Sequence, residues 1–359
     1  MVNIEAKADR ATELLELADR TLHAAMAVGP EQQQIVLKAS ETIEKIGRSM
    51  LRKIPEVAVL ELPENATVKE LRSARTRQAV RRGQELYLPI WSSAGHALPD
   101  VFRRTALFSA SSGIQKQNDL VLAGDGAMLM SNAEIASFND ISLLLSGYRL
   151  CQYDRQVYAT CLEFYRERPL APVGSHQPIR TTFHALATLM GGTHNAKTYQ
   201  AIRASLLRLS FATLRLRSKG IDTVVPSLLS VTFEDDGSSG EMHRRGLLLS
   251  ITEPVADLFG RASWSTVDKA VSDYDGLRGW LANFYASFNM ARWLSLETLY
   301  KLSGYDSRPV NFRNSLITAL DKLQSDRTPE SSRVRKYKIS ADRKQVLVAL
   351  ECWRSVRDE

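Results

Sequence analysis

The strongest constraint on the fold is an order of secondary-structure elements that the sequence carries twice between residues 119 and 359. Apolar residues that recur every three to four positions predict three helices in each copy, and alternating apolar residues predict strands after them. The helices of the first copy are expected near residues 154–166, 181–190 and 195–210, with strands at 211–217, 224–233 and 246–252. Those of the second copy are expected near 274–288, 294–302 and 310–324, with a hairpin of 337–339 and 346–350. This order predicts an α+β fold.

Three helices followed by a β-hairpin is the order of a winged-helix domain. In such a domain the third helix enters the major groove of DNA, and the hairpin, called the wing, contacts phosphate groups. The sequence therefore predicts tandem winged-helix domains, each with three helices and a β-hairpin wing, at residues 119–265 and 266–359. An N-terminal helical hairpin at 1–70 and a basic connector at 71–118 are expected to precede them.

The third helix of the second domain has an apolar side and a polar side. Its apolar side is formed by Phe312, Leu316, Leu320 and Leu323, which align at about 100° per residue. The polar side carries short amides, hydroxyls and cations rather than the Glu and Lys pairs of a solvated helix: Arg308, Asn311, Arg313, Asn314, Ser315, Thr318 and Lys322. Because such side chains hydrogen-bond to base edges, these residues are predicted to bind DNA.

The third helix of the first domain shows the same division. Tyr199, Ile202, Leu206 and Leu209 cluster on one side, and the opposite side carries Lys197, Gln200, Ala201, Ala204 and Arg208. Gln suits adenine, Lys and Arg suit guanine or phosphate, and alanines let a helix approach the groove closely. Lys197, Gln200 and Arg208 are therefore predicted DNA contacts.

The last hairpin is strongly basic. Six cations stand there against Asp342 alone: Arg333, Arg335, Lys336, Lys338, Arg343 and Lys344. Beside a recognition helix they are predicted to contact phosphate, although a charged edge that blocks strand pairing would look the same in sequence. A thinner counterpart in the first domain consists of Arg215, Arg217, Lys219, His243, Arg244 and Arg245.

Charge changes sign along the chain. Residues 1–70 hold 9 basic and 12 acidic side chains, a net charge of −3, whereas residues 71–110 hold 7 and 2, a net charge of +5. The basic stretch fits a phosphate-contacting arm and a solvated charged face equally well. In the acidic stretch, helices expected at 3–28 and 31–54 either pack on each other or serve dimerisation or a partner helix. The whole chain carries +7, which fits a polyanionic partner.

Several functional classes lack their sequence signals. Cys151, Cys161 and Cys352 include no CxxC pair, which argues against a disulfide scaffold and a structural zinc site. Residues 191–198 nearly match the phosphate-binding loop GxxxxGK[ST], but Ala196 replaces the second glycine and a helix precedes the segment. No metal or acid–base cluster is recognisable, so no metal, no cofactor and no catalytic residue are expected. The chain shows neither a leader nor an apolar run of about 20 residues, which predicts a cytoplasmic protein.

Five short segments resemble, in order, those of plasmid replication initiators of the TrfA type, relatives of the two-winged-helix Rep initiators. They are ELYLPIW at 85–91, RTALF at 104–108 (RSALF in the family), TFHAL at 182–186, ITEPVADLF at 251–259 and WLSLETL at 293–299. The similarity covers roughly residues 84–355. It implies binding to repeated origin sites called iterons, opening of a neighbouring A·T-rich segment, and recruitment of the host initiator, replicative helicase and sliding clamp.

In that family the clamp contact is a QL[SD]LF-like peptide just upstream of the RSALF-like segment. The matching stretch here is Glu85–Pro89, in which Leu86 and Leu88 fit the pattern and the first and last residues depart from it. The resemblance therefore assigns clamp binding to Leu86 and Leu88.

A non-enzymatic, origin-binding replication initiator is the leading hypothesis. The alternative is a winged-helix transcriptional repressor that binds operator DNA without replication activity, and a nuclease or strand transferase is a third. The sequence leaves open whether the active form is a monomer or a homodimer.

Overall fold

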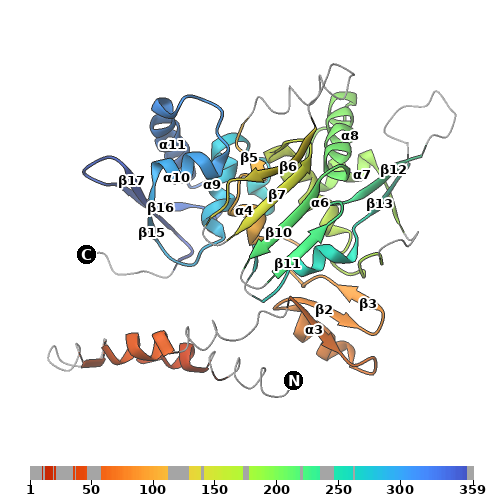
Figure 1. Cartoon of the computed structure of the whole chain (residues 1–359), viewed down its shortest axis with the longest axis horizontal. Helices are drawn as coiled ribbons and strands as arrows, with labels where there is room; N and C mark the ends of the chain where they lie inside the picture. The colour runs from red at the N-terminus through yellow and green to blue at the C-terminus, as the bar shows by residue number, and fades with distance from the viewer. Residues whose placement is uncertain are drawn as a thin grey trace. The chain divides into compact units, whose positions relative to one another are not determined.

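The computed structural model describes residues 10, 13–18, 20–21, 35–36, 38–46, 58–111, 129–138, 141–172, 178–218, 221–234, 246–261 and 263–353. The chain divides into two compact units, Met1–Glu56 and Val57–Glu359. Small sheets and helices alternate through the larger unit, so the expected α+β class is confirmed (Figure 1). The larger unit starts before the predicted boundary at residue 70, because strand β1 (Val59–Leu62) and helix α3 (Val68–Arg75) belong to it.

The first copy of the repeated order forms what we call the first module, residues 152–250. Its helices are α6 (Gln152–Glu163), α7 (Phe183–Leu189) and α8 (Ala196–Ser210), and its strands are β9 (Ile179–Thr182), β12 (Ser230–Phe233) and β13 (Gly246–Ser250). The strands form an antiparallel sheet in the order β12-β13-β9. Leu247 and Leu249 of the central strand are buried while their neighbours are only partly so, as expected for a sheet with one face on the core.

The second copy forms the second module, residues 276–350. It consists of α9 (Gly276–Ala286), β15 (Arg292–Ser295), α10 (Leu296–Ser303), α11 (Pro309–Leu323), β16 (Val334–Ile339) and β17 (Gln345–Leu350). Its antiparallel sheet has the order β15-β17-β16, so in both modules the first strand pairs with the last one. The two copies therefore share strand pairing as well as element order.

A strand runs directly into the second helix of each module and supplies its N-cap. Thr182 Oγ1 accepts a hydrogen bond from Ala185 N at 3.1 Å, and Ser295 Oγ accepts one from Thr298 N at 2.9 Å. The six expected helices are confirmed, with ends that differ from the predicted ones by at most three residues. The strands β9 and β15 were not expected, because each is only four residues long and its polar end residue is also the helix cap.

The predicted strand region 211–233 contains three strands that enter two sheets. β10 (Thr213–Ser218) and β11 (Ile221–Val225) join β6 (Met130–Ile135) and β7 (Ser142–Gly147) in a four-stranded sheet of order β11-β10-β7-β6, whereas β12 joins the first module's own sheet. A short parallel pair links β5 (Phe108–Ser109) to β8 (Leu150–Cys151) just before α6.

Residues 59–109 are a folded part of the larger unit, which corrects the prediction of a connector. β1 pairs with β2 (Ala79–Arg82), which pairs with β3 (Glu85–Tyr87), and β4 (Gly95–Pro99), followed by α4 (Asp100–Arg103), pairs with β14 (Trp264–Asp268). Two 3-10 helices, η2 (Glu253–Leu258) and η3 (Lys269–Val271), flank β14.

Two arginines of the predicted connector stabilise the fold instead of facing solvent as phosphate contacts would. Arg75 is 4% exposed and donates to the carbonyl oxygen of Leu88 at 2.8 Å. Arg103 is 2% exposed and donates to the carbonyl oxygens of His96 and Ser265. These side chains satisfy buried backbone acceptors, so they cannot form a phosphate-contacting arm.

The described residues of the larger unit form two clusters of buried apolar side chains. One includes Phe183, Tyr199 and Leu206 of the first module, and the other includes Trp280 and Phe312 of the second. The apolar sides predicted for α8 and α11 are thus confirmed as core-facing.

In the smaller unit, residues 13–18 and 38–46 are helical. Ser40 Oγ donates to the carbonyl oxygen of Ala18 at 2.8 Å, and both residues are buried. This contact favours the two helical segments packing on each other, and dimerisation through them stays a prediction. None of the helices that the structure describes is both long and apolar enough to span a membrane.

Candidate nucleic-acid interface

The polar side of α11 is exposed along its whole length. Asn311, Asn314, Thr318 and Lys322 are exposed, and so is Arg308, the N-cap residue of the helix. Intervals of three and four residues place these five side chains, which we call the α11 stripe, on one side of the helix. Within the described residues, none of the five side chains forms a hydrogen bond or an ion pair.

The opposite side of α11 holds the helix in place. Phe312 is 2% exposed and makes edge contacts with Tyr300 and Tyr305, while Leu316 and Leu320 are fully buried. Pro309 occupies the first turn, where a missing N–H costs no hydrogen bond. Because the apolar side is anchored in the core, the α11 stripe faces solvent in a fixed orientation.

Two other predicted contacts on α11 lie beside the stripe. Ser315 is partly buried and accepts a hydrogen bond from Tyr305 Oη at 2.8 Å. Arg313 is also partly buried. Val310, which is not among the predicted contacts, is 79% exposed in the first turn. An apolar residue there suits a thymine methyl group, and its signal in the sequence is a β-branched residue directly before Asn311.

The turn of the second module's hairpin presents cations to solvent. Arg343 has a φ of 59°, and Asp342 Oδ1 accepts hydrogen bonds from Ser340 Oγ at 2.5 Å and Lys344 N at 3.1 Å. These bonds lower the pKa of Asp342, so its carboxylate stays charged while it shapes the turn. The side chains of Arg343, Lys344 and Lys338 are exposed, and we call these three the wing cations.

The remaining basic residues of the hairpin are more enclosed. Arg333 donates to the carbonyl oxygens of Thr328 and Asp326 at 2.9 Å each and lies 3.7 Å from the Asp326 carboxylate. It therefore stabilises the loop after α11, which argues against its predicted phosphate contact. Arg335 and Lys336 are partly buried.

The hairpin is joined to α11 by polar contacts. Tyr337 Oη donates to Asp321 Oδ1 at 2.6 Å, and Gln324 Nε2 donates to the carbonyl oxygen of Arg335 at 3.4 Å. The hydrogen bond to the Asp321 carboxylate is the main cause that raises the pKa of Tyr337 to about 12. β16 thus lies along the C-terminal part of α11, and the α11 stripe and the hairpin belong to one rigid module.

On α8 the predicted contacts separate. Lys197 and Gln200 are exposed, and the alanines that follow them at 201 and 204 are partly buried. Arg208 is fully buried, and its Nε and Nη2 lie 3.0 and 2.8 Å from Asp154 Oδ1. The prediction that Arg208 contacts DNA is wrong, because this arginine is held by an ion pair inside the first module.

Lys197 borders a cleft of about 360 Å³ near the start of α8. Gln156 and Asp273 also line the cleft, so its charges are mixed. On the first module's other predicted basic segment, Arg215 and Arg217 are exposed and lie 3.9 and 3.0 Å from the Asp222 carboxylate. Lys219 and residues 243–245 lie outside the described residues.

The proposed clamp peptide is part of the core. Leu86 is 2% exposed and Leu88 is fully buried. Leu86 lies in β3 opposite Arg81, and its carbonyl oxygen accepts a hydrogen bond from Leu170 N at 2.7 Å. The assignment of Leu86 and Leu88 to clamp binding is therefore corrected: a partner could reach them only if this sheet unfolded.

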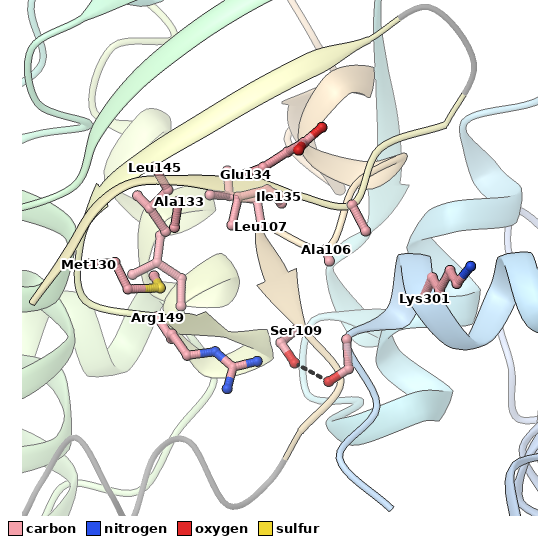
Figure 2. A pocket seen from close by; sticks show the side chains of 13 residues that line it. Ala106, Leu107, Ser109, Met130, Ala133, Glu134, Ile135, Leu145, Arg149 and Lys301 are labelled. Carbon is pink, nitrogen blue, oxygen red and sulfur yellow. Dashed lines mark hydrogen bonds between the residues drawn. The ribbon is translucent and has the colours of Figure 1, made fainter. Parts of the chain in front are cut away.

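A second pocket, of about 370 Å³, is lined by β6, β7 and the end of α10 (Figure 2). Met130 and Leu145 contribute apolar lining, and Arg149 contributes a charged side chain. Ser109 Oγ donates a hydrogen bond to the carbonyl oxygen of Gly304 at 2.7 Å. None of its lining residues belongs to the α11 stripe or the wing cations. Among the described residues no three His, Cys, Asp or Glu side chains are grouped so as to hold a metal ion.

Comparison with known proteins found similarity to solved structures. No family model and no curated protein matches the chain. The chain is similar to a crystal structure of RctB domains 2–3, with 15% sequence identity, a TM-score of 0.41, and coverage of 64% of this chain and 94% of that one. It is also similar to a selenomethionine crystal structure of domains 2 and 3 of RctB, with 13% identity, a TM-score of 0.41, and coverage of 64% of this chain and 93% of that one.

Proposed function

We propose that the chain is a double-stranded DNA-binding protein whose two modules are winged-helix domains. The observation that carries the proposal is the α11 stripe, an exposed row of amide, hydroxyl and cationic side chains on the third helix of a module that ends in a basic hairpin. Asn311, Asn314 and Thr318 would hydrogen-bond to base edges in the major groove, and the wing cations would contact phosphate.

The α11 stripe and the wing cations would contribute different parts of the binding free energy. Phosphate contacts supply affinity that falls with salt and is nearly independent of sequence, whereas base contacts supply discrimination. The first module would add a smaller contact through Lys197 and Gln200, and two modules on one duplex gain affinity through effective concentration.

The biological role we propose is replication initiation at repeated plasmid origin sites (iterons). The five segments that resemble TrfA-type initiators support this role over operator binding. The protein would act in the cytoplasm, without cofactor or catalysis, by using binding free energy to deform neighbouring DNA and by recruiting the host initiator and helicase.

Selection from a random pool of duplexes tests DNA binding. The full chain is expected to enrich a defined sequence and to bind it more tightly than a scrambled duplex in fluorescence anisotropy. A variant with Asn311→Ala, Asn314→Ala and Thr318→Ala should lose that preference. Lys301→Ala removes an exposed cation on α10 that is already paired with Glu297, and it should keep the preference. If nothing is enriched, or if the triple variant binds as the native chain does, the proposal fails.

A transformation assay tests the initiator role separately. The gene and an array of the selected sequence are placed on a circle that cannot otherwise replicate, and transformants are expected only when both are present. Tight sequence-specific binding without transformants would instead favour a transcriptional repressor.

A further inference from the structure

The two modules meet through a polar seam between their first helices, α6 and α9. Arg155 of α6 is 3% exposed, and all three nitrogens of its guanidinium group donate hydrogen bonds. Nε donates to Gln152 Oε1 at 2.8 Å, Nη1 to Asn283 Oδ1 at 3.3 Å, and Nη2 to the carbonyl oxygen of Ser272 at 3.5 Å. Two of these three acceptors belong to α9 or to the segment that leads into it.

Arg155 has no carboxylate partner within the part of the chain that the structure describes. Burial, and to a smaller extent the nearby Arg103, lowers the pKa of Arg155 to about 9. A buried cation without an ionic partner opposes folding, and an apolar side chain of similar volume would fill the same space at lower cost. Arg155 is therefore better explained by the geometry that its hydrogen bonds impose than by their net stabilisation.

Neighbouring contacts make the seam specific for one arrangement. Gln156 Nε2 donates to Asp273 Oδ1 at 2.9 Å, which adds a further bond between α6 and the segment that leads into α9. On α9, a Cβ atom at Gly279 would lie 1.9 Å from the carbonyl oxygen of Tyr274, so the chain before α9 folds closely over that helix only because residue 279 is glycine.

We propose that Arg155 is a positioning residue that fixes α9 on α6 in one register and thereby holds α8 and α11 at one separation. An apolar seam could slide, because neighbouring registers bury similar areas. A planar guanidinium group with one acceptor for each nitrogen cannot slide without leaving buried polar groups unpaired.

Distance measurements by double electron–electron resonance test the proposal without DNA. Spin labels are attached at Thr188→Cys on α7 and Glu297→Cys on α10, both exposed positions, and the exposed native cysteine is removed by Cys352→Ser. The parent protein is expected to give one narrow distance distribution. Arg155→Met should broaden it roughly twofold or add a second distance, because one arrangement is no longer strongly favoured.

Two further variants keep the test decisive. Asn283→Ala removes a single acceptor of the seam and should broaden the distribution less than Arg155→Met. Arg208→Met removes another fully buried arginine that contacts α6, but inside one module, and should lower stability without broadening the distribution of the folded protein. Unchanged widths in both seam variants, or equal broadening by Arg208→Met, would overturn the proposal.

The consequence for DNA rests on the proposed function. If both modules contact one duplex, the parent protein should bind its selected site tightly at one spacing between the two contacted segments, and Arg155→Met should bind sites of altered spacing more nearly equally. Absence of DNA binding would refute the proposed function and leave the distance result standing.

Discussion

Helices α8 and α11 hold the same place in two modules of the same order, yet they expose different surfaces. Both are 15 residues long, and when their apolar sides are superposed Gln200 corresponds to Asn314 and Arg208 to Lys322. Lys322 is exposed, whereas Arg208 is fully buried. The α11 stripe thus continues along the whole helix, while the matching surface of α8 ends after its first half.

The difference originates in the helix that packs behind each of them. The third residue of α6 is Asp154, which is fully buried and accepts hydrogen bonds from Ser205 and Arg208 of α8. The third residue of α9 is Arg278, whose guanidinium carbon lies 3.5 Å from the centre of the Tyr274 ring. A buried carboxylate on one helix, here Asp154, can therefore pair with a cation of the neighbouring helix, here Arg208, that the helical pattern alone places on the exposed side. Two modules with one element order need not share one function.

The largest expected effect is on the free energy of unfolding. It distinguishes the ion-paired Arg208 of α8 from Lys322, its exposed counterpart on α11. Arg208→Met leaves the Asp154 carboxylate buried without its cation and should lower the free energy of unfolding by about 3–5 kcal/mol. Lys322→Met should change it by less than about 0.5 kcal/mol, as is usual for exposed sites. Urea denaturation measures both. Similar losses in the two variants would remove the contrast between α8 and α11.

A smaller effect is expected on DNA recognition. Asn314→Ala should weaken binding to the selected duplex by about 1–3 kcal/mol and leave scrambled duplexes nearly unaffected, since a base contact is lost. Gln200→Ala should cost less than about 1 kcal/mol, because only half of α8 is accessible. Anisotropy titrations at one salt concentration compare them, and a larger loss for Gln200→Ala would reverse the roles assigned to the modules.

The wing cations should affect salt dependence rather than sequence preference. Lys338→Ala should weaken binding to every duplex alike and reduce the slope of log affinity against log salt by about 1. Arg333→Ala, whose side chain already bonds to Thr328 and Asp326, serves as the matched control and should leave the slope unchanged. Equal slopes for both variants would argue against phosphate contact by the wing.

The smallest effect concerns the attachment of the hairpin to α11. Hydrogen bonding to Asp321 raises the pKa of Tyr337 from 10.0 to about 12, so the folded state holds this proton more tightly than the unfolded state. The resulting stability is present below pH 10 and is lost as the pH rises towards 12.

Tyr337→Phe removes the hydroxyl group that bonds to Asp321. The urea midpoint of the variant should therefore fall less between pH 8 and pH 11 than that of the native chain. The difference should stay below about 1 kcal/mol because the pair is exposed. An identical pH dependence in both proteins would show that the bond does not contribute in solution.

Sequence periodicity predicts the features of each helix that depend only on its own residue pattern, namely its position and its apolar side. The six helices of the modules and the apolar sides of α8 and α11 were recovered, because the spacing of Tyr199, Leu206, Phe312 and Leu316 reflects burial directly. Periodicity carries no information on the partner of an outward residue. The acid that buries Arg208 is 54 positions away, and nothing local marks the pair.

The clamp peptide shows a different limit of sequence reasoning. Leu86 and Leu88 alternate with Glu85 and Tyr87, and such alternation is typical of a strand. A short peptide motif assumes that its backbone is available to a partner. Here the backbone of β3 is already paired with β2, so the same leucines pack in the core.

The most direct test of the account asks whether Asn314 lies against a particular base pair. Affinities of the native chain and Asn314→Ala are measured for a panel of duplexes in which each position of the selected site is changed in turn. The α11 stripe predicts that Asn314→Ala loses discrimination at one or two adjacent positions and retains it elsewhere. Full discrimination at every position in the variant, or a uniform loss across the site, would contradict the placement of α11 in the groove.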